Sequence, residues 1–262
     1  MSTATATAPA PTVYAELRAA DVIDVLAAVA PFAATRQEAR YTPVFSGIFI
    51  ALPTLPSLEP GSPAPLLALA TDKYALAIAT TYAPNVDTDA LGIPTGWPID
   101  TDTLYAASGW YVAPPRAQLI NALRRASGGT SRKAAKGVRF TVALTPNEGI
   151  TFTGPGDAES VFMPHAAPGA ITAYSTLNVA RAHLGTPPCE PPLEGSLYNP
   201  AQLAKFAHLA DSPGYNDDRH ARVRISYSAL TYYKTPVLTA RVPAGTLLSG
   251  GTRHAMMMPI KE

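Results

Sequence analysis

Several features that are common in other protein classes are scarce or missing in this chain. A single cysteine, Cys189, excludes an internal disulfide and favours a reducing, cytoplasmic setting. The longest apolar stretches, Pro65–Ala70 and Ala75–Ala79, are far too short to span a membrane. Charged residues make up only 15% of the chain and the net charge is +1, so overall charge predicts no partner and only local clusters can.

The first residues lack the features of a targeting segment. Residues 1–11 are rich in Ser, Thr, Ala and Pro, and no basic region is followed by an apolar core. We therefore expect a disordered N-terminal lead at residues 1–11, with the folded chain beginning at residue 12.

No residue pattern typical of a metal site or a phosphate loop can be recognised. The histidines are scattered, and no pair has the spacing of metal ligands; they lie at positions 165, 183, 208, 220 and 254. The glycine-rich, basic stretch Gly128–Lys133 follows a predicted helix and lacks the spacing of a phosphate-binding loop. We expect no cofactor and no metal.

One cluster keeps an enzyme open as the less favoured alternative. Asp211, Asp217, Asp218 and His220 place carboxylates beside a histidine, as a hydrolase site with a cation would require. Residues 212–216 between them are typical of a turn, however, and a turn accounts for the cluster without chemistry. We therefore expect no enzyme activity.

What the sequence does contain is a repeated order of strands and helices. The pattern of residues 12–163 predicts a strand, a helix and three strands, followed by a strand, a helix and strands again. This order is one βαβββ unit that occurs twice. The predicted strands are 13–18, 44–52, 66–70, 74–82, 104–112, 138–144 and 150–153, and the predicted helices are 19–32 and 115–126. This region forms the first predicted domain.

Residues 164–262 form a shorter second predicted domain, which repeats half of the pattern. A helix is predicted over 199–210, with strands at 222–227, 236–242 and 256–260. Between 166 and 196 the pattern is weaker, and we expect a strand at 171–177 and a short helix at 178–184. Helices followed by antiparallel strands, without βαβ crossovers, indicate an α+β protein.

Three landmarks resemble the bacterial DNA polymerase III β sliding clamp family. Pro43–Ile48 followed by Leu67–Ala77 is similar to the family's middle domain, whose strand–turn–strand reads ATDG-x-RLA; here Lys73-Tyr74 replaces the usual Gly-His. Tyr198–Leu203, Thr235–Leu238 and the final Met256–Ile260 are similar to the family's last domain, which ends on VVMPMR. The landmarks occur in the family's order and span roughly residues 12–164 and 196–262.

The resemblance implies a DNA-clamp-like fold, with repeated βαβββ units and helices on one face of antiparallel sheets. It implies a processivity factor that performs no bond chemistry. A ring encloses duplex DNA without reading its sequence and tethers the replicative polymerase, and a clamp loader is a further partner. The family has three domains per subunit and this chain has two, so a head-to-tail trimer would complete a six-domain ring.

A monomeric, clamp-like protein-binding module that does not encircle DNA is the main alternative, because the second domain is short. A reduced clamp of this Ala- and Pro-rich composition fits a bacteriophage of a GC-rich host, and its location would then be the host cytoplasm.

Basic residues gather in one segment that could face DNA. Between Arg116 and Arg139 the sequence has no acidic residue. We expect phosphate contacts, which are independent of base sequence and sensitive to salt, from Arg116, Arg124, Arg125, Arg132, Lys133, Lys136 and, on the third helix, Lys205. A solvated helix end is the alternative, since basic residues suit a helix C-terminus.

The resemblance also implies a groove for short partner peptides with apolar anchors. Thr71, Tyr74 and Leu76 would line one side, and Met257, Met258, Pro259 and Ile260 the other. Methionine suits such a groove because its unbranched thioether adapts to several ligands. The alternatives are an ordinary hairpin turn at 71–72 and a final strand that only packs in the core.

Overall fold

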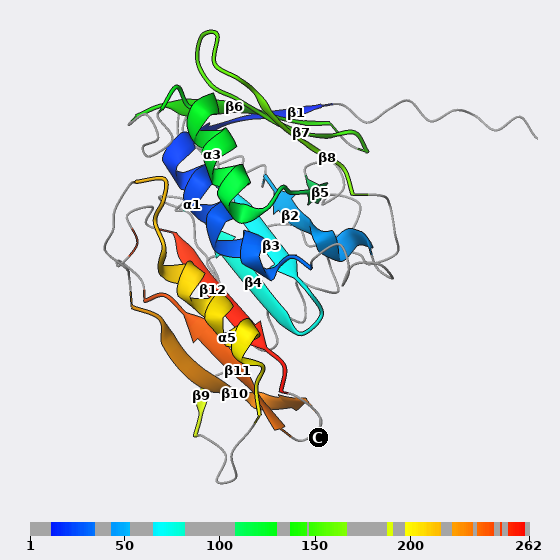
Figure 1. The fold of residues 1–262 in the computed structure, drawn as a ribbon, viewed down its shortest axis with the longest axis vertical. Helices are drawn as coiled ribbons and strands as arrows, with labels where there is room; N and C mark the ends of the chain where they lie inside the picture. The colour runs from blue at the N-terminus through cyan, green and yellow to red at the C-terminus, as the bar shows by residue number, and fades with distance from the viewer. Residues whose placement is uncertain are drawn as a thin grey trace, which may run out of the picture.

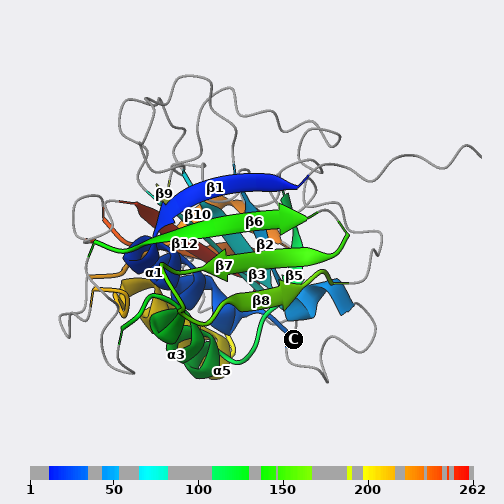
Figure 2. The same ribbon diagram turned by 90° about the horizontal axis from the view of Figure 1, so that it is seen from above.

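A computed structural model gives the fold of the chain. It describes residues 12–34, 43–52, 65–81, 108–129, 137–145, 147–166, 188–190, 197–215, 222–232, 235–243, 247 and 251–259. Within these ranges lie three α-helices and two antiparallel sheets, so the α+β class predicted from the sequence is confirmed. Figures 1 and 2 show the helices gathered together beside the two sheets.

The first unit joins helix α1 (Ala19–Val29) to strands β2 (Gly47–Ala51), β3 (Leu67–Thr71), β4 (Ala75–Thr80) and β5 (Ser108–Val112). Every residue of α1 is buried, which explains its almost wholly apolar sequence. The helix ends where Pro31 follows, because proline has no backbone N–H to donate, and a 3-10 turn, η1 (Ala30–Phe32), replaces the next turn.

The second unit joins helix α3 (Arg116–Ala126) to strands β6 (Arg139–Thr145), β7 (Gly149–Thr153) and β8 (Val161–Pro164). Leu119, Ile120 and Leu123 give α3 one buried face, and Gly128 ends it with a φ of 72°. β6 alternates exposed and buried residues, as expected for a sheet with one covered face.

The two units exchange a strand with each other. β1 (Val13–Arg18) precedes α1 in the chain, yet it pairs with β6 of the second unit. β5 precedes α3, yet it pairs with β2 of the first unit. The strand orders are therefore β1-β6-β7-β8 in the smaller sheet and β5-β2-β3-β4 at one end of the larger sheet. This exchange links the two halves into one body.

The third unit extends the larger sheet. It contains β9 (Pro188–Cys189), α5 (Pro200–Lys205) with the 3-10 turn η4 (Phe206–Ala210), β10 (Arg224–Tyr232), β11 (Thr235–Arg241) and β12 (Thr252–Met257). β12 pairs with β4 from Thr252 opposite Thr80 to Met257 opposite Ala75. This pairing makes one eight-stranded sheet that crosses the boundary predicted at residue 164 (Figure 1). The division into two domains stays a prediction.

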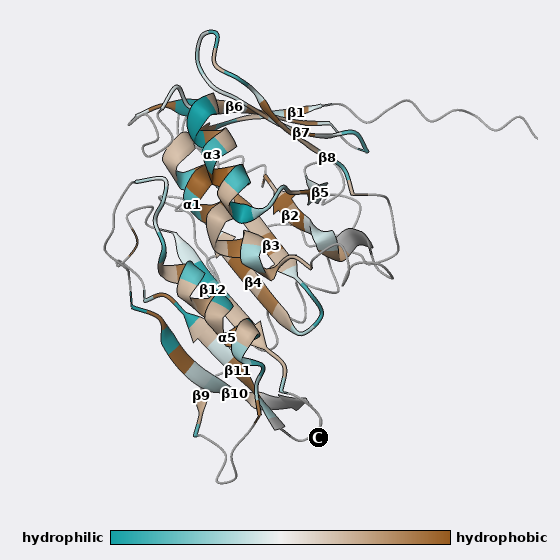
Figure 3. Cartoon of the chain, viewed as in Figure 1, coloured by the Kyte–Doolittle hydropathy of each residue, from teal (hydrophilic) through white to brown (hydrophobic). Residues whose placement is uncertain are grey.

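The two faces of the larger sheet contact different groups of residues. Ala68, Ala70, Ala75 and Ala77 face α1 and join the main core, where small side chains allow the helix to pack close to the strands. The intervening residues, such as Leu69 and Ile78, form a second buried cluster on the opposite face with Phe49 and Trp110. Figure 3 shows the apolar character of α1 and of strands β2 to β4.

Most predicted elements are present, with shifted ends. The predicted helix 199–210 begins at Asn199, whose side chain caps it, but changes to 3-10 geometry after Lys205. The last strand begins four residues earlier than predicted, at Thr252, and ends at Met257. The strand at 171–177, the helix at 178–184 and the lead at 1–11 lie outside the described residues. No helix among the described residues is long and apolar enough to cross a membrane.

The junction of β4 and β12 predicts a large effect for Gly251→Ala. A Cβ at Gly251 would lie 1.8 Å from the backbone oxygen of Thr80, so the two strands would have to separate. We expect unfolding free energy to fall by about 3 kcal/mol, with faster hydrogen exchange at the β12 amides. Gly128→Ala is the control for backbone strain alone, because its φ is positive and the space around it is open; it should leave exchange at the β12 amides unchanged. Slow exchange at β12 in Gly251→Ala would contradict this reading.

Candidate functional site

The turn between β3 and β4 lies beside the end of the last strand. Leu76 is the cross-strand neighbour of Met256, and Met258 N donates to Tyr74 O over 2.8 Å. The structure therefore brings together two segments, about 71–76 and 256–259, that are far apart in the sequence and that the resemblance assigned to one partner site. We call the solvent-accessible part of this junction, formed by the exposed Tyr74 and the partly buried Met258 and Pro259, the docking surface.

Asp72 fixes the shape of this turn. Its Oδ1 accepts from Tyr74 N at 3.0 Å and from Ala75 N at 2.8 Å, and Thr71 Oγ1 donates to Ala75 O at 2.9 Å. Lys73 has a φ of 83°, and its ammonium lies 5.5 Å from the centroid of the Phe45 ring. These bonds leave the Tyr74 side chain 62% exposed at the tip of the turn.

Strand alternation divides the methionines between two faces. Met256 belongs to the second cluster together with Leu76, and Met258 packs partly buried against that cluster. Met257 is 1% exposed and lies in the main core on the helix side. Its predicted place in a peptide groove is therefore corrected, because successive residues of a strand point to opposite faces. Pro259 is partly buried, and Ile260 lies outside the described residues.

Helix α5 is bonded to the same turn. Asp72 Oδ2 accepts from Gln202 Nε2 at 2.6 Å and from Lys205 Nζ at 2.5 Å. The Asp72 side chain has no exposed surface, and the Lys205 side chain is 19% exposed. The predicted DNA contact of Lys205 therefore competes with an ion pair inside the chain.

Two arginines of α3 are also bonded within the chain. Arg116 donates from Nε to Ala27 O at 2.9 Å and from Nη2 to Asp211 Oδ2 at 2.6 Å. Arg124 Nη2 donates to Pro213 O at 2.6 Å, and burial lowers the pKa of its guanidinium. Arg125 is the most exposed of the predicted DNA contacts that are described, and it lies 3.2 Å from Glu159. Arg132, Lys133 and Lys136 lie outside the described residues.

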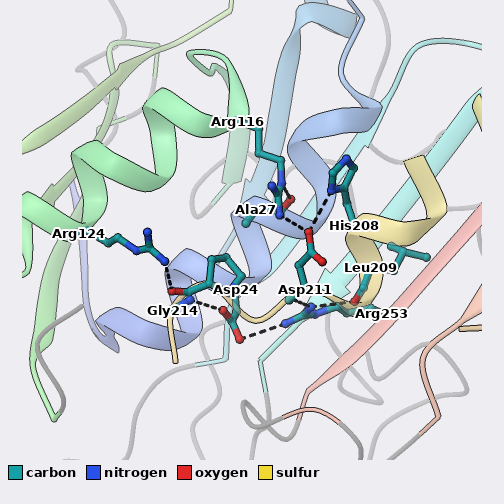
Figure 4. A network of polar contacts seen from close by, with 10 residues as sticks. Asp24, Ala27, Arg116, Arg124, His208, Leu209, Asp211, Gly214 and Arg253 are labelled. Carbon is teal, nitrogen blue, oxygen red and sulfur yellow. Dashed lines mark hydrogen bonds and ion pairs between the residues drawn. The ribbon is translucent and has the colours of Figure 1, made fainter. Parts of the chain in front are cut away.

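A buried ion pair joins the third unit to α1. Arg253 Nη2 of β12 lies 3.2 Å from Asp24 Oδ2, and both side chains are almost wholly buried (Figure 4). Arg253 Nη1 also donates to Leu209 O at 2.8 Å and to Asp211 O at 2.5 Å. The turn that follows η4 is bonded to α1. Gly214 N donates to Asp24 Oδ1 at 2.6 Å, and the Tyr215 hydroxyl donates to Asp21 Oδ1.

Burial dominates the titration of this pair. Desolvation raises the pKa of Asp24 to about 6, although Arg253 and the hydrogen bond from Gly214 act in the opposite direction. Desolvation also lowers the pKa of Arg253, although Asp24 raises it. The pair therefore makes folding stability sensitive to pH in the range where Asp24 gains its proton.

Of the possible hydrolase cluster, the structure describes only Asp211. Asp211 is held between Arg116 and His208, whose Nδ1 lies 3.1 Å from Asp211 Oδ2. Asp217, Asp218 and His220 lie outside the described residues, and within the described ranges no three metal-ligating side chains form a cluster.

Sequence reasoning missed the residues that make these connections, namely Asp24, Gln202 and Arg253, and treated Asp72 only as a turn residue. A weak signal was present for Asp24 alone, since it interrupts the apolar stretch 22–30, whereas Arg253 lies between Thr252 and His254. A charge in an apolar stretch calls for a buried partner, but the sequence does not say which one.

Comparison with known proteins identifies the fold. No protein-family model and no curated protein sequence matches the chain. The β subunit of a DNA polymerase from Streptococcus pyogenes matches in structure over 100% of this chain and 68% of its own, with 13% identity and a TM-score of 0.50. The β chain of DNA polymerase III from Streptococcus pneumoniae TIGR4 matches 100% of this chain and 67% of its own, with 13% identity and a TM-score of 0.48.

A DNA polymerase sliding clamp from Caulobacter crescentus gives a TM-score of 0.49 at 13% identity, over 98% of this chain and 68% of its own. The match to the Streptococcus pyogenes β subunit shows that the chain has a β-type clamp fold. The chain spans about two thirds of the length of these clamps. The fold predicted from the resemblance is confirmed.

The Asp24–Arg253 pair predicts a pH-dependent effect of Arg253→Met. Removing the guanidinium leaves a buried carboxylate without its partner, which costs about 3–5 kcal/mol of unfolding free energy at pH 8. Because the folded-state pKa of Asp24 is already raised and would rise further, protonation stabilises the folded variant as pH falls. The stability gap between the original chain and Arg253→Met should therefore narrow from pH 8 to pH 5.

Denaturant unfolding at several pH values measures that gap. Asp24→Asn combined with Arg253→Met is the control, because without the carboxylate this narrowing should disappear. A gap that stays constant or widens toward pH 5 would contradict the assigned pair.

Proposed function

We propose that this chain is a DNA sliding clamp, a polymerase processivity factor without enzyme activity. One observation carries the proposal. The chain has the β-type clamp fold, and its larger sheet continues across the β4–β12 junction while α1, α3 and the α5–η4 segment pack together on one side of it. Copies of such a sheet joined head to tail around a closing rotation would give a continuous wall with the helices on one side.

The proposed mechanism is topological. A head-to-tail ring encloses duplex DNA, and a polymerase bound to the ring cannot diffuse away from its template. Tethering raises the polymerase concentration at the primer end without any new contact to the bases. The chain acts in the cytoplasm, which is that of the host if the protein comes from a bacteriophage.

The docking surface is the proposed site of the polymerase and of a clamp loader. Tyr74 and Met258 lie side by side there, beside the apolar cluster that contains Leu76 and Met256. A partner peptide with apolar anchors would bury Tyr74 further. A clamp from Pseudomonas aeruginosa binds griselimycin, which makes that compound a practical probe.

A second candidate function is a clamp-like module that binds a protein without encircling DNA. All four described cations predicted to contact DNA are bonded inside the chain. Arg116, Arg124 and Lys205 make partly buried bonds, and Arg125 makes an exposed pair with Glu159. Within the described part of α1, α3 and α5, Arg125 is then the main exposed basic residue. Weak attraction for phosphates would favour this candidate.

Solution mass combined with DNA retention separates the two candidates. We expect light scattering to give about three times 27.4 kDa and the loaded protein to stay on nicked circular DNA at a salt concentration that releases it after linearisation. This loss is expected because a ring slides off a free end. A monomer that releases both DNA forms equally would support the non-encircling module and reject the clamp.

Charge reversal tests the DNA-facing segment. Arg125→Glu combined with Arg132→Glu and Lys133→Glu should weaken DNA retention by about tenfold or more at low salt and reduce the salt dependence of binding. Arg241→Glu, compared with Arg125→Glu alone, is the matched control, because Arg241 is exposed on β11 and alternation places it on the sheet face away from the helices. Equal loss in the control would point to general electrostatics and not to a DNA-facing segment.

A further inference from the structure

Asp72 makes more connections than a turn residue needs. Its Oδ1 accepts from two backbone amides, Tyr74 N and Ala75 N, which is enough to hold the turn. Its Oδ2 accepts from two side chains of α5, Gln202 and Lys205, which follow it by more than a hundred residues in the sequence. One carboxylate therefore joins the turn to a helix of the third unit.

The chemistry of this contact is specific. A buried carboxylate is unfavourable unless its oxygens are satisfied, and here both oxygens accept short, well-formed bonds, one of them from a cation. Gln202 Nε2 faces Asp72, while Gln202 Oε1 is buried without a hydrogen-bond partner. The bond to Asp72 thus determines the orientation of the Gln202 side chain, and in this orientation the amide oxygen has no hydrogen-bond partner.

The contact lies directly behind the docking surface. Tyr74, whose N–H is held by Asp72, accepts a hydrogen bond from Met258 N. On the other side, Tyr198, which precedes α5, donates from its hydroxyl to Pro236 O of β11. A displacement of α5 would therefore reach Tyr74 and Met258 through Asp72, and a displacement of the turn would reach α5 by the same route.

We propose that Asp72 is a positioning residue for partner binding. Together with Lys205 and Gln202, it holds the docking surface in its binding geometry before the partner arrives. The proposal rests on the proposed function, because it assumes that this surface binds a partner. Ordering in advance favours affinity, since the turn does not lose conformational freedom on binding.

Lys205→Met tests the proposal with the least disturbance. The substitution keeps an unbranched side chain that is one atom shorter, and it removes the cation from Asp72. We expect hydrogen exchange to become about tenfold faster at the amides of Tyr74, Ala75 and Met258, and the Kd for griselimycin to rise by about tenfold, as loss of a charged hydrogen bond would give. Lys205→Arg should restore both values, because a guanidinium can still donate to Asp72.

Asp72→Asn should have the same effects as Lys205→Met, and the double variant should lose less than the two single losses combined. Arg139→Met is the control, since it removes a cation from Glu16 in an exposed pair on the smaller sheet. It should alter neither the three amides nor the probe.

The two readouts separate the possible failures. Unchanged exchange at the three amides in Lys205→Met overturns the positioning role, whatever the probe does. Faster exchange with an unchanged Kd also overturns it, and leaves Asp72 with a structural role only. If the original chain does not bind griselimycin while the exchange rates respond as expected, the assigned docking function of the surface is overturned and the coupling of turn to helix stands.

Discussion

The placement of the third unit depends on a charge pair that water cannot reach. Asp24 lies in a helix whose residues are all buried, and Arg253 lies in the strand that extends the larger sheet. Neither charge is stable in the interior alone, so the two can be buried only together. Hydrogen bonds from Arg253 to Leu209 O and Asp211 O and from Gly214 to Asp24 surround the pair. These bonds specify one position of the third unit, because a shifted position would leave a charge unpaired.

Apolar packing alone would be less specific at this junction. The main core brings together residues from α1, α3, the 3-10 turn η4 and both sheets. The free energy of such contacts is roughly proportional to the apolar area that they bury and does not depend on direction. Apolar packing alone therefore permits small shifts of the third unit along the core. The pairing of β12 with β4 fixes the register along the strands, and the close approach of Gly251 to Thr80 leaves no room for another side chain. The buried charge pair, the strand register and the close contact at Gly251 together fix the eight-stranded sheet, which each subunit of the proposed ring would contribute.

The small number of charged residues also bears on the proposed ring. The chain has few charged residues, and several of its cations stabilise the fold. A clamp needs only weak attraction for phosphates, since a ring is retained by its topology and must still slide. Cations bonded within the chain are therefore compatible with a clamp if the ring closes, and they favour a protein-binding module if it does not.

The sequence by itself determined the order and type of the elements. Period-2 and period-3.6 patterns and the glycines that end the helix at 115–126 are local signals. Within the described residues they agree with the structure for most elements. The resemblance also led to the prediction that residues 71–76 and 257–260 line one partner site. That site stays a prediction, and the structure places Tyr74 beside Met258.

Only the tertiary structure decided which charges meet and which way the side chains face. Arg116, Arg124 and Lys205 look like free cations in the sequence, because their partners Asp211, Pro213 and Asp72 are distant along the chain. Met257 is adjacent in sequence to Met256 and Met258. Side-chain alternation along β12 nevertheless places Met257 in the main core and the other two at the second cluster on the opposite face. The exchange of β1 and β5 between units is likewise invisible in local patterns. Hydrogen bonds between strands and ion pairs between helices depend on distances in space, and a linear pattern carries no information on those distances.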